Sequence, residues 1–221
     1  MTVPHASIYR VGYIAGLLAF IATVSFFVVQ LLQLLRVTTY PLDAILIYGT
    51  SLCIVIPFVL EILALHYITP ADKQFWSHAA VLCTVVYAVF VSANYVVQLA
   101  TVIPMTLAGR LQEVSILDQT PHSLFWNFDA LGYIFMGLAT LFALPAFAKT
   151  GMQLWVRRAF LANGLVTPLI AFVYFYPTFT EGLLMLGLPW AITAPASMLL
   201  LALMFRRESG GLGQGTLPKI S

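Results

Sequence analysis

Six long apolar runs, separated by short polar breaks, dominate this sequence and limit the folds open to it. Each run is long enough for a helix that crosses the hydrocarbon core of a bilayer, which takes about 20 residues. The runs lie near residues 10–36, 44–68, 75–104, 122–148, 154–176 and 182–205. Pro41, Pro70 and Gly151 stand in the breaks and give the helices local reasons to end. We therefore predict an all-α polytopic membrane protein, built as a six-transmembrane-helix bundle.

The composition agrees with a membrane protein and excludes a water-soluble domain. Of the 221 residues, 61% are hydrophobic and only 8% are charged, too few polar side chains to cover a soluble surface. The formal net charge of +2 is small and the basic residues are scattered over the segment ends, so we expect no nucleic acid partner. Residues 1–208 are expected to form a single six-helix transmembrane domain, and the glycine-rich residues 209–221 a flexible cytoplasmic tail.

The distribution of basic residues predicts how the chain is oriented in the membrane. With six crossings, both termini lie on the same side. The basic residues expected on that side are Arg10, Lys73, Lys149, Arg157, Arg158, Arg206, Arg207 and Lys219. The opposite side has only Arg36 and Arg110. Because Lys and Arg accumulate on the cytoplasmic side, we predict a multi-pass protein of the cell membrane, surrounded by membrane lipids, with cytoplasmic N- and C-termini.

Asp129 is the most unusual residue of the apolar runs. It lies seven residues after His122, about 10 Å below the outer end of the fourth run at the rise of a helix. An ionisable side chain at such depth is costly, and it usually faces a bundle interior or a wet cavity, where it serves a ligand, an ion or a proton. Trp126 and Tyr133 share its helical face at offsets of three and four residues. The candidate site is therefore centred on Asp129.

Other runs carry polar and aromatic residues at the same depth. In the third run, Asn94 and Gln98 fall on one helical face in the outer half. Small-ligand sites typically combine aromatic walls with a few polar groups. The residues predicted to bind a ligand are Asn94, Gln98, Trp126, Asp129, Tyr133, Tyr174 and Trp190. We predict that they line an intrabundle pocket in the outward half.

Glu61 is the second carboxylate inside an apolar run, and it lies in the cytoplasmic half of the second helix. One interpretation is structural, with the carboxylate held by an ion pair or a hydrogen bond. The residues expected to offer such a partner are Asn163, Tyr13, Arg10 and Arg158. The other interpretation is a relay, in which Glu61 on the inner side and Asp129 on the outer side hand over protons.

The connection from about residue 105 to residue 121 is the longest of the chain and is predicted to lie outside. Its apolar residues fall near helical periodicity, and they are Leu107, Leu111, Val114 and Leu117. We expect an amphipathic segment that rests on the lipid headgroups, with a lid over an outward-facing cavity as the alternative.

No motif predicts a metal or a cofactor. No two histidines share a helix at the spacing of HxxxH, and His66 and His78 flank a cytoplasmic turn. The sequence also lacks the GxSxG, HExxH, phosphate-loop and glycine-rich nucleotide motifs. We therefore predict no metal and no cofactor.

Three functions agree with these features. The first is binding of a small apolar or amphipathic, lipid-like molecule, with Asp129 and Asn94 orienting its polar end. The second is proton-coupled transport, in which Asp129 and Glu61 change protonation, and the small size of the chain then points to a homodimer. The third is a membrane enzyme of the isomerase or cyclase type that modifies a lipid or isoprenoid, with Asp129 as general acid.

Overall fold

The computed structural model describes residues 5–212, and it is all-helical, with 84% of the residues in helices and no strand in the described part. The α-helices are α1 (His5–Leu34), α2 (Leu42–Ile68), α3 (Gln74–Val97), α4 (Ile103–Leu107), α5 (Leu111–Val114), α6 (Leu124–Ala143), α7 (Gly151–Phe175), α8 (Glu181–Leu184) and α9 (Trp190–Leu212). Six helical stretches within residues 5–212 are long and apolar enough to cross a membrane, which confirms the predicted architecture at that level.

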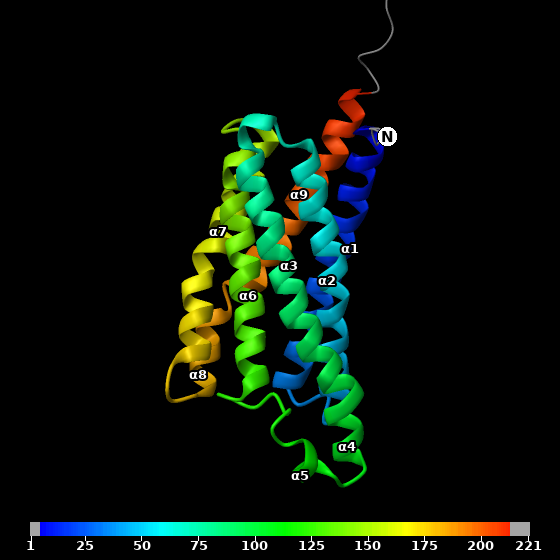
Figure 1. Ribbon diagram of the computed structural model, residues 1–221, viewed down its shortest axis with the longest axis vertical. Helices are drawn as coiled ribbons and strands as arrows, with labels where there is room; N and C mark the ends of the chain where they lie inside the picture. Colours follow the sequence, from blue (N-terminus) through cyan, green and yellow to red (C-terminus); the bar gives the residue numbers. More distant parts are fainter. Residues whose placement is uncertain (1–4, 213–221) are drawn as a thin grey trace, which may run out of the picture.

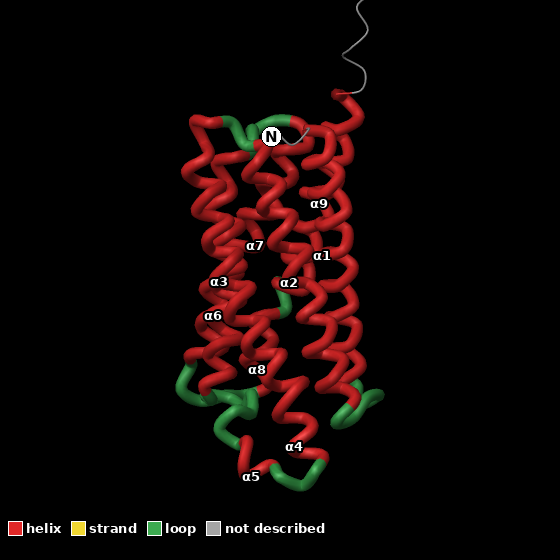
Figure 2. The backbone as a smooth tube through the Cα atoms, turned by 45° about the vertical axis from the view of Figure 1, so that its right-hand side comes forward, coloured by secondary structure: helices red, strands yellow, loops and turns green. Residues whose placement is uncertain are grey.

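The six long helices form a closed ring in the order of the sequence. α1 packs on α2, α2 on α3, α3 on α6, α6 on α7 and α7 on α9, and α9 returns to pack against α1. All six run along the long axis of the molecule (Figures 1 and 2). The start of α1 and the end of α9 lie at one end, called here the terminal end, and α4 and α5 lie at the other, called the loop end (Figure 1).

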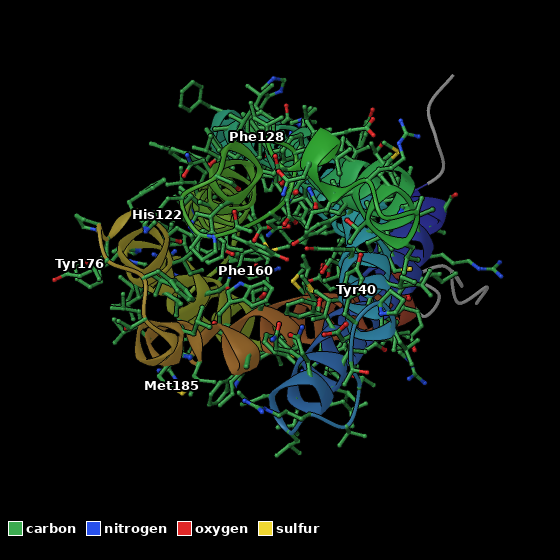
Figure 3. The ribbon with its side chains drawn as sticks, turned by 90° about the horizontal axis from the view of Figure 1, so that it is seen from below. Tyr40, His122, Phe128, Phe160, Tyr176 and Met185 are labelled. Atoms are coloured by element: carbon green, nitrogen blue, oxygen red, sulfur yellow. The ribbon has the colours of Figure 1, made fainter. Side chains whose placement is uncertain are left out.

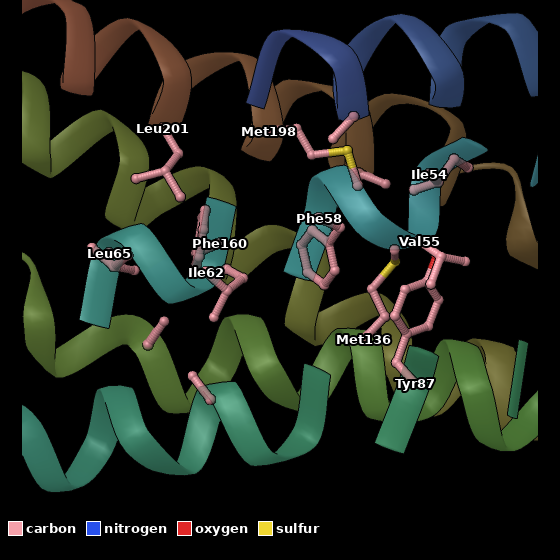
Figure 4. Close-up of a cluster of buried hydrophobic side chains, with 14 of the residues drawn as sticks. Ile54, Val55, Phe58, Ile62, Leu65, Tyr87, Met136, Phe160, Met198 and Leu201 are labelled. Atoms are coloured by element: carbon pink, nitrogen blue, oxygen red, sulfur yellow. The ribbon is translucent and has the colours of Figure 1, made fainter. Parts of the chain in front are cut away.

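Side chains fill the middle of the ring. Phe58 of α2, Met136 of α6, Phe160 of α7 and Leu201 of α9 are each no more than 1% exposed. They meet in one cluster, which Figure 4 shows together with Tyr87 of α3. A buried cluster of this kind separates the polar groups near the loop end from those near the terminal end.

Several helices differ in detail from the predicted runs: α6 ends at Ala143 and not near residue 148, and α9 begins at Trp190 and not near residue 182. α9 continues to Leu212, so residues 209–212 of the predicted tail are helical, and residues 213–221 lie outside the described part. Between α3 and α4 the chain makes a wide π-helical turn, η2 (Gln98–Val102), before Pro104. Proline has no N–H and its ring disturbs the preceding turn of an α-helix, and π-helical turns occur frequently at functional sites. η2 lies beside the candidate site described next.

Candidate functional site

α6 begins with a capped turn that fixes the position of Asp129. His122 has a φ of +67°, and the hydroxyl of Ser123 accepts a hydrogen bond from the backbone N–H of Trp126 at 3.2 Å. This is the usual geometry of a serine N-cap. Asp129 follows on the second turn of α6 and is only 3% exposed.

The Asp129 carboxylate is held by three side chains from α3 and α7. Its Oδ1 atom accepts a hydrogen bond from the hydroxyl of Tyr95 at 2.6 Å and one from the amide of Asn94 at 3.3 Å. Its Oδ2 atom accepts a hydrogen bond from the hydroxyl of Tyr174. The one ion pair found within residues 5–212 does not involve Asp129. A buried carboxylate is thus held by hydroxyl and amide dipoles, without a positive charge.

Tyrosine and tryptophan rings surround this carboxylate. The hydroxyls of Tyr95 and Tyr133 lie 2.9 Å apart, and the ring of Tyr133 packs edge-on against Trp190 at a centroid distance of 4.8 Å. The Trp126 ring packs on Tyr174 at 4.6 Å, and its Nε1–H donates to the Tyr174 carbonyl at 3.1 Å. Interlocked rings with paired hydroxyls leave the carboxylate little freedom to move.

The connection between α4 and α6 folds onto this end of the bundle. Val114 is 4% exposed, and the side chain of Gln98 donates to the Leu117 carbonyl at 2.7 Å. The amide of Asn94 donates to Oε1 of Gln119 at 2.9 Å, so the same residue contacts both Asp129 and the connection. These contacts fit the alternative of a lid better than a segment that rests on headgroups alone.

A partly open cavity of about 370 Å³ lies under the connection at the loop end. The residues that line it are Gln33, Tyr40, Asp43, Ala44, Tyr48, Gln98, Val102, Ile103, Thr106, Leu111 and Asp118. Asp129 is not among them. The contact with the Asp129 network runs through Tyr48, whose ring lies 5.4 Å from that of Tyr95. In Figure 3, which looks onto the loop end, Tyr40 and His122 lie on different sides of the bundle.

The structure therefore divides the predicted site residues into two groups. Six of them meet around the carboxylate, and they are Asn94, Trp126, Asp129, Tyr133, Tyr174 and Trp190. Gln98 faces the connection and lines the cavity. Tyr95 was not among the predicted site residues, although Tyr87, Val91 and Tyr95 follow one another in steps of four and are all buried. Tyr48 and Gln119 were not predicted either, because the sequence has no local signal for them.

The prediction that Asn163, Tyr13, Arg10 or Arg158 pairs with Glu61 is wrong. Glu61 is 0% exposed, and neither of its carboxylate oxygens has a hydrogen-bond partner in the described part of the chain. The side chain of Asn163 bonds instead with the hydroxyls of Thr140 and Thr193, at 3.5 and 3.2 Å. Two of the other expected partners pair elsewhere, because Tyr13 stacks with Arg206, and Arg158 lies 5.1 Å from the ring of Trp155.

Among residues 5–212, no three His, Cys, Asp or Glu side chains gather where they could hold a metal ion. His66 instead shares a hydrogen bond of 2.9 Å with the hydroxyl of Ser77. Comparison with known proteins gives no further guidance, because no family model, no curated protein and no solved structure matches this chain.

Proposed function

We propose that this chain is a multi-pass protein of the cell membrane, with cytoplasmic termini, that binds a small amphipathic molecule at its loop end. Two features support the membrane setting. Leu18, Ile21 and Val28 of α1 are each more than half exposed, as lipid-facing side chains are (52%, 56% and 53%). Most basic residues of the described part lie near the terminal end, which by the positive-inside rule is the cytoplasmic one.

The observation that carries the binding function is the cavity and its link to the Asp129 network. Its volume of about 370 Å³ is in the range of small-molecule sites. Tyr48 and Gln98 line it and reach back to the network, Tyr48 by stacking on Tyr95 and Gln98 from the turn that follows Asn94. The Oδ1 atom of Asn94 is buried without a hydrogen-bond partner in the described part. Asn94 itself does not line the cavity, so the network acts as a rigid support behind the cavity, which is what pre-organised binding needs.

The lining of the cavity indicates the chemistry of the ligand. Asp43 and Asp118 contribute carboxylates, and no basic side chain lines the cavity. The hydroxyl of Thr106, also in the lining, has no hydrogen-bond partner within residues 5–212. Tyr40 and Tyr48 present aromatic rings, which attract cations. A ligand with a positively charged head and an apolar body of modest length fits this lining best.

Asp129 acts in this proposal as a positioning residue. A general acid must reach its substrate directly or through one water, whereas Asp129 does not line the cavity and already accepts three hydrogen bonds. The geometry thus supports binding over lipid chemistry by Asp129. Proton-coupled transport is the second candidate, because Glu61 is buried without a partner in the described part of the chain.

The test uses octylamine that carries a photoreactive diazirine on its chain, with the matched octanoic acid as control probe. The full chain, reconstituted in lipid nanodiscs, is irradiated with either probe, and the crosslinked peptides are mapped by mass spectrometry. We expect the amine to label the segments around Tyr40–Tyr48 and Gln98–Leu111, the acid to label them weakly, and excess octylamine to compete.

Charge-removing variants complete the test. The double variant Asp43→Asn/Asp118→Asn should lower the amine crosslinking by about tenfold, the change that roughly 1.4 kcal/mol of binding energy produces. Asp72→Asn removes an acid at the terminal end and should leave the crosslinking unchanged. Asp129→Asn should weaken it, since one donor of the network loses its carboxylate acceptor. Equal labelling by both probes, without competition, would refute the proposed site.

A further inference from the structure

Glu61 is the most isolated polar side chain in the terminal half of the bundle. It is 0% exposed, and both carboxyl oxygens lack a hydrogen-bond partner within residues 5–212. Its carboxyl group lies against Gly16 of α1, close to where Ala202 of α9 packs, and a Cβ atom at position 16 would collide with both residues. The glycine therefore makes room for the carboxyl group.

The ligand that this carboxyl group can bind is found by excluding the alternatives. An ionised carboxylate buried without a partner is strongly unfavourable. Hard metal cations take about six oxygen ligands, whereas no group of three or more His, Cys, Asp or Glu side chains within residues 5–212 could hold a metal ion. A proton needs only the carboxyl group itself.

We propose that Glu61 is an exchangeable proton-binding site that is reached from the terminal end of the bundle. The inference goes beyond the ligand site at the loop end, and neither depends on the other. Glu61 binds the proton on a carboxyl oxygen, holds it in the apolar core, and releases it along the contact between α1 and α9.

The contact between α1 and α9 supplies the route. Tyr13 lies three residues before Gly16, and Arg206 lies four residues after Ala202, so both are about one helical turn nearer the terminal end. The guanidinium of Arg206 lies 5.7 Å from the centre of the Tyr13 ring. Arg206 is exposed and Tyr13 is half-buried, so this pair lies near the surface on the terminal side of Glu61, beside the buried ring of Phe205 that packs against Gly12. A positive charge at this point also repels an approaching proton, so the pair controls entry.

The other direction is closed by the core. Phe58, one turn before Glu61 on α2, packs edge-on against Tyr87 at 5.6 Å. Ile54 and Met136 belong to the same buried cluster and are 0% exposed. Ile54, Val55 and Phe58 come between Tyr48 and Glu61 along α2, and Figure 4 shows their side chains in the buried cluster with Met136 of α6. Exchange is therefore confined to the terminal end.

Other titratable groups on the helices that pack against α2 also contribute to any pH dependence of proton binding at Glu61. On α1, α3 and α9 near this end they are Tyr9, Arg10, Tyr13, His78, Cys83, Tyr87, Arg206, Arg207 and Glu208. Arg206 has the defined contact with Tyr13 described above, and Glu208 accepts a hydrogen bond from Gln153 at 2.8 Å.

The first experiment uses dicyclohexylcarbodiimide, an apolar reagent that modifies protonated carboxyl groups in membranes. The acid proton passes to a carbodiimide nitrogen while a carboxyl oxygen bonds to the central carbon, and the adduct rearranges to an N-acylurea without losing any atom. The full chain in nanodiscs should carry the adduct on the peptide that contains Glu61, and Glu61→Gln should abolish it. Mapping by mass spectrometry separates this adduct from one on Asp129.

The second experiment measures exchange by infrared spectroscopy. The carbonyl stretch of a protonated carboxylic acid, absent in Glu61→Gln and in Glu61→Leu, should shift when the sample is moved into D₂O. Arg206→Ala should accelerate that shift several-fold, whereas Arg207→Ala, its exposed neighbour, should not. Glu61→Leu is a second control, with an apolar side chain, for the case that the glutamine variant does not fold.

Two results would overturn the proposal. One is a Glu61 peptide that stays unmodified at every pH in nanodiscs but is modified after unfolding in detergent at acidic pH. The other is a carboxylic acid band that belongs to Glu61 and does not shift in D₂O. The ligand site at the loop end is tested by crosslinking of octylamine, so its failure would leave both of these measurements unaffected.

Discussion

The bundle contains two buried carboxyl groups whose surroundings are opposite. Asp129, near the loop end, accepts hydrogen bonds from Tyr95, Asn94 and Tyr174. Glu61, near the terminal end, is equally buried, yet neither of its oxygens has a partner in the described part of the chain. The first group is held by a network, and the second occupies a space that Gly16 leaves open.

Burial alone does not define what an intramembrane acid does. A carboxylate with several donors stabilises the arrangement of the helices that supply them, because each donor would otherwise be buried unpaired. A buried carboxyl group without partners adds no stability, so stability does not explain its place in the core.

The largest effect is expected from replacing each acid by leucine. Asp129→Leu leaves two tyrosine hydroxyls and an amide without their acceptor and should lower the free energy of unfolding by about 2–4 kcal/mol. Glu61→Leu removes a group that bonds to nothing and should leave that free energy unchanged or raise it. Reversible unfolding in mixed micelles with increasing dodecyl sulfate measures both. Equal losses for the two variants would break the comparison.

The second effect concerns the space beside Glu61. Gly16→Ala places a Cβ atom against the Glu61 carboxyl group and Ala202, and overpacking of this kind costs about 1–3 kcal/mol. The same change in a Glu61→Ala background should cost less, because only the contact with Ala202 then remains. The coupling free energy from this double-mutant cycle is the quantity to measure.

Gly49→Ala is the matched control for that cycle. It lies in the same helix as Glu61, and apart from its chain neighbours and the backbone of its own helix turns, no atom of the described residues lies within 4 Å of an added Cβ. Alanine forms helices better than glycine, so this variant should gain up to about 1 kcal/mol. A loss at Gly49 as large as that at Gly16 would mean that the measured cost is not local crowding.

The third effect tests the network at Asp129. Tyr95→Phe removes the hydroxyl that contacts both Asp129 and Tyr133 and should cost about 1–2 kcal/mol. Tyr48→Phe is the control, because the Tyr48 ring stacks on Tyr95 while its hydroxyl makes no hydrogen bond within residues 5–212. Similar unfolding midpoints for the two phenylalanine variants would show that the packed rings, and not the hydrogen bonds of the hydroxyls, stabilise the site.

Much of the fold could be predicted from the sequence, because length and hydropathy are local properties. Asp129, Trp126 and Tyr133 could be assigned to one helical face by their spacing alone. Tyr95 belongs to a buried stripe, but its spacing could not identify it as a donor to Asp129, because that partner lies on another helix. Gln119 lies in a connection whose fold depends on contacts with the bundle end.

The environment of Glu61 could not be predicted for the same reason. The sequence offers several side chains that could pair with it, but the ring brings Gly16 and Ala202 to its carboxyl group instead. Arg206 is only one turn away on α9 and stacks on Tyr13. The order in which the helices pack around the ring decides which residues contact a buried acid. No local sequence pattern predicts that order.

The smallest effect is expected at a third acid, Glu113, which is paired but exposed. Arg110 donates to both of its oxygens at 2.8 and 2.6 Å, and these hydrogen bonds lower the pKa of Glu113 and raise that of Arg110. A lowered pKa in the folded state makes the contribution of the pair present above the unfolded pKa and lost as the pH falls through the folded one.

Solvent screening should nevertheless make that contribution unmeasurable, since the two side chains are 54% and 56% exposed. Glu113→Gln is therefore expected to leave the unfolding midpoint unchanged at pH 7 and at pH 4. If its midpoint shifted as far as that of Tyr95→Phe, partners would matter regardless of exposure. The different effects of Asp129 and Glu61 on stability would then come from their hydrogen-bond partners alone. Burial would not be needed for those partners to matter.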